Sequence, residues 1–357
     1  MHGLTRLAIL AALGAATGLT GACTGEFSFG PVDSPLPEFD FGPPVDAGPL
    51  PDFGPLDDPD ADPEDRTLAV VCDRWNAEHV QNATAQSSGT ELTSCTPGMA
   101  TPAALDDATR RLNLYRWLNG LLPVTHNNDP GRLAAQQDCA MIMARNSALS
   151  HFPPMSWACW TEGGDEAAGS SNLSLGRRTG AGSINGFMID NGANNAPVGH
   201  RRWFLHQRLD TVSFGIVAEE GAPGATCAHV FDVDGAPSRR PFTAFPNPGY
   251  APFAQLGGAS TRWSVQSDRI AADDFVRVTD LTDQRERPVR PDPGNGGFAA
   301  GGGIGGGVTL VWLPDGWTPT PRHRYRVVIG DLLDPSLEYE TELVDCPGDP
   351  IPDPGFP

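Results

Sequence analysis

Four side chains in the middle of the sequence are of the types that build metal sites and proton-transfer networks. His151 and His200 lie in stretches that contain glycine and tryptophan, and Glu166 and Asp190 fall between them. Neutral imidazoles and carboxylates bind Zn²⁺ and other divalent metals, and the same groups serve as general acids and bases. If the four share one cleft, the sequence predicts a metal site or a hydrogen-bond network. The alternative is that each histidine sits at a turn and bonds only to backbone.

Recognisable motifs surround these residues. His151 lies in Leu149-Ser-His-Phe-Pro-Pro-Met-Ser-Trp157, and Glu166 lies in Gly164-Asp-Glu-Ala-Ala-Gly-Ser-Ser-Asn-Leu173. His200 lies in Val198-Gly-His-Arg-Arg-Trp-Phe-Leu205. Upstream are Leu112-Asn-Leu-Tyr-Arg-Trp-Leu-Asn-Gly-Leu-Leu-Pro-Val124 and Leu133-Ala-Ala-Gln-Gln-Asp-Cys-Ala140. Over about residues 100 to 235, this pattern resembles the CAP superfamily of cysteine-rich secretory, antigen 5 and plant pathogenesis-related proteins.

The resemblance implies an α-β-α sandwich and gives roles to three of the four side chains. His151 matches the first histidine of the family. Glu166 with Asn172 stands at the Gly-Glu-Asn motif, and Gly199-His200 matches a Gly-His pair that opens a short helix. The family also favours binding and signalling over established catalysis.

Other positions depart from the family or rest on weaker grounds. Asp190 is a candidate only through its place ten residues before His200, and Asp165 is its nearest rival. Leu112 replaces the usual histidine, and Arg201-Arg202-Trp203 replaces the common Tyr-Thr-Gln.

Two functions follow from this group of residues. The first is a non-catalytic module whose cleft binds a divalent metal, or a small lipid, glycan or peptide ligand. The second is a hydrolase in which His151 or His200 is the general base and Glu166 its orienting partner. No serine lies in a Gly-x-Ser-x-Gly elbow and no His-Glu-x-x-His motif is present, so the sequence favours binding.

The N-terminus predicts export. Residues 1–22 have one arginine, an apolar run and small residues before Cys23, as in a secretory signal. Thr20-Gly-Ala-Cys23 resembles a bacterial lipoprotein box, which implies a lipid on Cys23 that attaches the protein to a membrane. Thr24 is not the aspartate that retains lipoproteins at an inner membrane, so the resemblance places the protein at the outer membrane or cell surface. The alternative is an ordinary cleaved signal that leaves Cys23 unpaired.

The remaining six cysteines are even in number and predict three disulfides in an exported chain. Fifteen connectivities are possible from sequence alone. Proximity along the chain and the expected domain boundaries favour Cys72–Cys95, Cys139–Cys159 and Cys227–Cys346.

Composition separates a tether from a folded part. Residues 23–66 are rich in proline and acidic side chains, which predicts a disordered tether, and residues 347–357 predict a disordered tail. The tether carries much of the net charge of −20, so the folded part is only mildly acidic and gives no support to nucleic-acid binding. All 24 basic residues are arginine, which excludes lysine Schiff-base chemistry and the Walker phosphate loop.

We predict an α+β protein with two folded domains. The CAP-like α-β-α domain spans 67–235, with helices over 101–120, 130–145 and 184–189 and strands over 211–217 and 227–233. Residues 68–72 are apolar and fit either a helix or a strand. Alternating runs over 261–265, 275–279, 308–313, 324–329 and 337–344 predict an immunoglobulin-like β-sandwich over 236–346.

Overall fold

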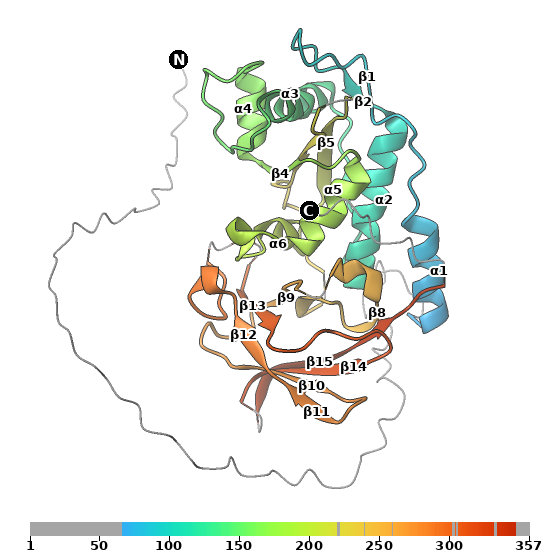
Figure 1. Cartoon of the computed structure of the whole chain (residues 1–357), viewed down its shortest axis with the longest axis vertical. Helices are drawn as coiled ribbons and strands as arrows, with labels where there is room; N and C mark the ends of the chain where they lie inside the picture. The colour runs from blue at the N-terminus through green and yellow to red at the C-terminus, as the bar shows by residue number, and fades with distance from the viewer. Residues whose placement is uncertain are drawn as a thin grey trace, which may run out of the picture. The chain divides into compact units, whose positions relative to one another are not determined.

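The computed structural model describes residues 66–219, 222–238, 240–258, 260–301, 304, 306–331 and 334–347. All of them belong to one compact unit that mixes helices and sheets, as predicted for an α+β protein (Figure 1). The predicted signal peptide, the lipidation site Cys23, the tether up to residue 65 and the tail from residue 348 lie outside the described residues.

The predicted helices form close to their expected positions. α2 (Pro102–Leu118) and α3 (Pro130–Asn146) each begin with proline, which has no N–H to leave unpaired in the first turn. α5 (Gly180–Ile189) starts earlier than expected because Thr179 caps it, accepting a hydrogen bond from the N–H of Gly182 at 2.9 Å. The apolar run at 68–72 belongs to a helix, α1 (Leu68–Glu78).

Three further short elements carry the site. α6 (Gly199–Phe204) is the short helix that the Gly-His motif implied. α4 (Glu162–Gly169) and the strand β4 (Ser171–Leu175) were not predicted. The three glycines of α4 make it a weak helix by propensity, and the cap at Thr161, which accepts from the N–H of Gly164 at 3.0 Å, supports its first turn.

A four-stranded sheet lies at the centre of the helical part (Figure 1). β3 (Thr125–His126) runs parallel to β5 (Thr211–Val217), and β6 (Ala225–His229) pairs antiparallel with both β5 and β4. Phe214 and Ile216 of β5 share a hydrophobic cluster with α2 and α5. Leu173 and Cys227 belong to a second cluster with α3 and α4. Helices therefore cover both faces of the sheet. A separate hairpin joins β1 (Ser87–Ser88) to β2 (Met99–Ala100).

The C-terminal part contains two sheets, and the five predicted runs correspond to five of their strands, while the other four strands were not predicted. In sheet order the first contains β11 (Arg285–Arg287), β10 (Val276–Asp280), β14 (Arg324–Gly330), β15 (Pro335–Val344) and β8 (Gly249–Pro252). The second contains β12 (Val289–Pro291), β13 (Val308–Pro314), β9 (Trp263–Ser267) and β7 (Phe242–Phe245). Short 3₁₀ turns occur at Ala193–Asn195, Phe253–Leu256 and Pro293–Asn295.

Aromatic side chains pack the two sheets against each other. The ring centroids of Trp263 in β9 and Tyr325 in β14 are 5.5 Å apart, as are those of Phe242 in β7 and Tyr339 in β15. The same hydrophobic cluster includes Leu112 of α2 and continues into the helical part. The helical and β-rich parts therefore share a core.

All six downstream cysteines form disulfides, but the predicted pairing was wrong. The bonds are Cys72–Cys346, Cys95–Cys159 and Cys139–Cys227, with Cα–Cα distances of 5.0, 5.2 and 6.1 Å. Nearness along the chain was a poor guide because packing brings distant elements together. α3 lies against β6, so Cys139 faces Cys227. α1 packs beside β8, next to β15, and Cys72 thereby meets Cys346 at the end of the described chain.

Candidate functional site

Two of the predicted site residues form a carboxylate–histidine pair. Asp190 caps the C-terminus of α5 in the left-handed conformation, with φ of 52°, which a short polar side chain tolerates. Its Oδ1 lies 2.7 Å from Nδ1 of His200, and its Oδ2 accepts the backbone N–H of Arg201 at 3.3 Å. The Asp190 side chain is fully buried, whereas 22% of the His200 side chain is exposed. The buried carboxylate thus fixes the ring and leaves Nε2 without a hydrogen-bond partner among the described residues.

Two buried arginines hold the backbone at the C-terminal end of α5, residues 188–190, in place. Nη1 of Arg262 donates to the Asp190 carbonyl at 2.9 Å, while Nε of the same guanidinium pairs with Asp292 at 2.7 Å. Arg201 donates to the carbonyls of Met188 and Ile189 at 2.5 and 2.9 Å. These donors satisfy carbonyls that a helix end leaves unpaired. Burial lowers the pKa of Arg201 to about 9, so it stays charged at neutral pH.

Arg262 lies just before β9, in the β-rich part, and Nη1 of Arg201 reaches its carbonyl at 3.0 Å. The β-rich part therefore fixes the turn that carries Asp190.

His151 lies in the long loop between α3 and α4. Like His200, it is held through Nδ1 of its ring. Its Nδ1 is 2.9 Å from the carbonyl oxygen of Ala168, near the end of α4. A carbonyl can only accept, so Nδ1 carries the proton and Nε2 of the neutral ring presents a lone pair. His151 is exposed, and Phe152 beside it is 80% exposed.

Both histidines are tied to residues 168–172, which we call the junction segment because it joins α4 to β4. His151 bonds to Ala168 at one end of the segment. At the other end Nδ2 of Asn172, the predicted motif residue, donates to the His200 carbonyl at 3.1 Å. Both residues therefore contact one segment, but no three of the ligand atoms of His151, Glu166, Asp190 and His200 lie within 4.8 Å of one another.

The two predicted carboxylates, Glu166 and Asp190, differ in their exposure to solvent. Glu166 is exposed on α4 and has no side-chain partner among the described residues, so its carboxylate is open to a ligand. Asp190 is enclosed, and both its oxygens are already hydrogen-bonded. Its position suits orienting His200. Asp165, its rival, lies on α4.

A third histidine also reaches the junction segment, and the sequence analysis did not select it. His229, at the end of β6, places Nδ1 3.1 Å from Oγ of Ser170 and Nε2 3.0 Å from Oδ1 of Asp232. Nη1 of Arg132 lies 2.5 Å from the same Nε2. The sequence signal nearest to it is the Asp232-Val-Asp-Gly235 stretch, whose residue types favour a tight turn.

This group resembles a Ser-His-Asp arrangement, but its proton positions oppose that chemistry. Arg132 can only donate, so its contact requires a lone pair on Nε2 of His229, whereas a hydrogen bond to Asp232 requires a proton there. Burial lowers the pKa of His229 despite the hydrogen bond with Asp232, which favours the neutral ring. The contact from Arg132 then favours the tautomer with the proton on Nδ1. That proton points at Ser170, so His229 is not placed to deprotonate the serine.

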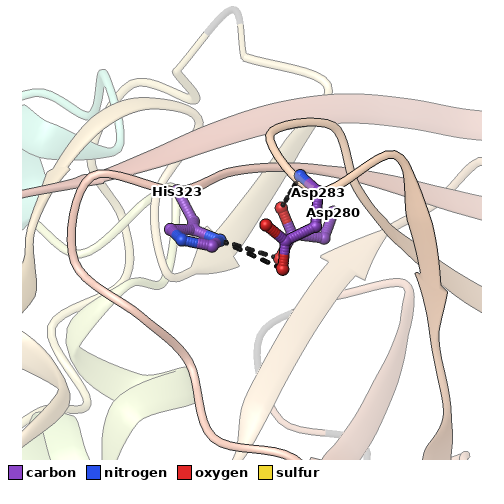
Figure 2. A group of neighbouring side chains, drawn as sticks. All are labelled: Asp280, Asp283 and His323. Atoms are coloured by element: carbon purple, nitrogen blue, oxygen red, sulfur yellow. Dashed lines mark hydrogen bonds and ion pairs between the residues drawn. The ribbon is translucent and has the colours of Figure 1, made fainter.

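A separate group of side chains in the β-rich part consists of residue types that commonly bind metal ions. Asp280, Asp283 and His323 bring one ligand atom each within 4.8 Å of one another, the one such group among the described residues (Figure 2). This group could hold a metal ion. Nδ1 of His323 lies 2.9 Å from Oδ2 of Asp280, as the dashed lines in Figure 2 mark.

Arg287 already supplies a positive charge to this group. Its Nη2 contacts Asp280 at 2.7 Å and also contacts Asp283. Asp280 further accepts the backbone N–H groups of Thr282 and Asp283, at 3.1 and 3.2 Å. Although burial alone would raise its pKa, the hydrogen bonds from His323 and Arg287 lower it. Asp280 and Asp283 lie at the β10–β11 hairpin, so a cation bound there would share both carboxylates with the Arg287 guanidinium.

No protein-family model matches this sequence, and the search of curated proteins found no relative. Among the described residues, no helix combines the length and apolar character needed to span a bilayer. The three disulfides suit an oxidising, extracellular environment.

Proposed function

We propose that this protein is an exported, lipid-anchored member of the CAP superfamily that binds a divalent metal at the junction segment. His151 and His200 supply Nε2 ligands, Glu166 supplies a carboxylate, and Asp190 orients His200. Zinc is the first candidate, because imidazole nitrogen and carboxylate oxygen suit it. The site is non-catalytic in this proposal, and the bound metal presents a small extracellular lipid, glycan or peptide ligand.

One observation carries the proposal. Nδ1 of each histidine is engaged by an acceptor, the Ala168 carbonyl for His151 and the Asp190 carboxylate for His200. Histidines that bind metals almost always donate their other ring N–H in this way, which fixes the tautomer and aims the free nitrogen. The ring of His151 and the backbone carbonyl of His200 also contact the junction segment, and Glu166 lies one turn of helix before its middle.

The test is metal analysis of the full-length chain purified without chelators. We expect about one equivalent of zinc or another divalent metal per chain. The double variant His151→Ala/His200→Ala should lose it while keeping the circular dichroism spectrum, because both side chains are partly exposed. His323→Ala serves as the control and should keep the metal. Loss of metal in His323→Ala alone would move the site to the Asp280 group.

A second function, hydrolysis, is favoured by one specific feature, the Asp190–His200 pair. A buried carboxylate behind an imidazole is the arrangement of a general base. A metal-free protein that cleaves ester or peptide substrates, and loses that activity in His200→Gln, would establish this function over metal binding.

The anchor is tested separately. If Cys23 carries a lipid, Cys23→Ala should move the protein from the membrane fraction to the soluble fraction. Unchanged partitioning would exclude the lipid anchor and leave an ordinary secreted protein.

A further inference from the structure

A cavity of about 400 Å³ lies away from the histidines described above. Four segments contribute to its lining: residues 205–208 after α6, residues between 237 and 243 that lead into β7, residues 266–269 at the end of β9, and Gly306 and Gly307 before β13. Its volume is within the range of small-molecule sites, about 300–1,000 Å³. None of His151, Glu166, Asp190 and His200 lines it.

The lining is positively charged, although the whole chain has a net charge of −20. Arg208, Arg240 and Arg269 all line the cavity, and Asp268 is the one carboxylate that does. Most arginines of the β-rich part pair with carboxylates, for example Arg277 with Glu286 at 3.4 Å and Arg290 with Asp315 at 3.8 Å. The three cavity arginines form no ion pair with any described carboxylate.

Arg240 is the most unusual of the three. Only 7% of the residue is exposed, and its Nε is buried without a hydrogen-bond partner among the described residues. Burial lowers its pKa to about 10, so the guanidinium still carries its charge at neutral pH. Burying an unpaired charge is unfavourable, and a nearby anion relieves that cost.

The rim of the cavity is held by backbone contacts. Nδ1 of His206 accepts the N–H of Arg208 at 3.1 Å, and Nε2 of Gln207 donates to the Arg240 carbonyl at 2.9 Å. Burial lowers the pKa of His206, and the charges of Arg116 and Arg208 lower it further, so the ring is neutral and adds no charge. The arginines therefore give the cavity its net positive charge.

We propose that this cavity binds a small polyanion, whose phosphate, sulfate or carboxylate groups pair with Arg208, Arg269 and Arg240. Guanidinium groups bind such oxyanions through paired, charge-assisted hydrogen bonds. Asp268 at the rim repels anions and partly offsets the positive charge of the three arginines. The site is independent of the metal site, so either can fail without the other.

The experiment measures binding to the full-length chain by isothermal titration calorimetry at low salt. The probes are inorganic phosphate, inorganic sulfate, citrate and, as a neutral reference, glucose. We expect saturable binding of at least one anion, none of glucose, and weaker binding as salt screens the charges. Arg208→Ala/Arg269→Ala should lower the affinity by about tenfold or more, and Asp268→Asn should raise it.

The matched control is Arg277→Ala/Arg290→Ala, which removes the same charge from the β-rich part outside the cavity. It should change the affinity little. An equal loss in both double variants would show general charge attraction and overturn the proposal, as would the absence of saturable binding for every anion. Preference for phosphate and sulfate over citrate would assign a phosphorylated or sulfated ligand, and the reverse a polycarboxylate.

Discussion

At the scale of single residues, one buried carboxylate decides which nitrogen of His200 can take part in chemistry. Asp190 accepts from Nδ1 at 2.7 Å and from the backbone of Arg201 at 3.3 Å. A neutral ring held in this way has its proton on Nδ1 and its lone pair on Nε2. Asp190 therefore acts through His200. This role explains why Asp190, which the sequence analysis predicted as a metal ligand, has a fully buried side chain.

Asp190→Asn tests this positioning role. The amide can turn its NH₂ toward Nδ1 and so stabilise the tautomer with the proton on Nε2, which cannot bind a metal. We expect the metal affinity to fall by about 10- to 100-fold, the usual effect of losing such a partner. Competition titration with a zinc-binding dye measures it, and Asp165→Asn is the control of equal charge change. Equal affinities in the two variants would argue against a role for Asp190.

At the scale of elements, local sequence signals predicted much of the fold. Caps and proline positions placed α2 and α3 within a few residues, and the alternating runs placed β5, β13 and β14. α4 and β4 were missed because glycine and small polar side chains hide the helical and alternating patterns there. These two elements carry the junction segment, so the contact between His151 and Ala168 could not be foreseen from motifs.

Contacts between residues far apart in the sequence could not be predicted either. Motif matching selected His151 and His200, but it had no means of finding His229 or Arg262, which reach the site through sheet pairing and through the β-rich part. The disulfides failed for the same reason. Cys72 and Cys346 are 274 residues apart and meet only because α1 packs beside the C-terminal sheet.

The Cys72–Cys346 bond should therefore be a major contributor to the stability of the unit. Cys72→Ser/Cys346→Ser should lower the free energy of unfolding by about 2–5 kcal/mol, because the bond closes a long loop in the unfolded chain. Urea denaturation measures the change. Cys95→Ser/Cys159→Ser, which opens a loop of 64 residues, is the comparison and should cost less. A larger loss in the second variant would show that local strain or packing, and not loop closure, dominates.

At the scale of the whole molecule, several histidines are held neutral by burial. Burial lowers the pKa values of His79, His126, His206 and His229 below the ordinary 6.5. The shift is largest for His79, whose pKa falls to about 3 through burial and then through the charge of Arg111. Its ring stacks on Trp75 with centroids 4.4 Å apart.

These shifts predict that acid destabilises the protein from about pH 6.5 downward. Below 6.5 the unfolded chain takes up protons on these histidines while the folded chain does not, so stability falls as pH drops toward the folded pKa values. The lowered pKa of Asp280 acts in the same direction, but only near the ordinary carboxylate pKa of 3.8 and below. Urea midpoints at about pH 7.5 and about pH 5 therefore isolate the histidine contribution. His79→Gln should reduce the difference between the two midpoints, whereas His151→Gln, which changes an exposed ring, should leave it as in the wild type. If His79→Gln keeps the full wild-type difference, the acid sensitivity arises from the other buried histidines and His79 is not its main source.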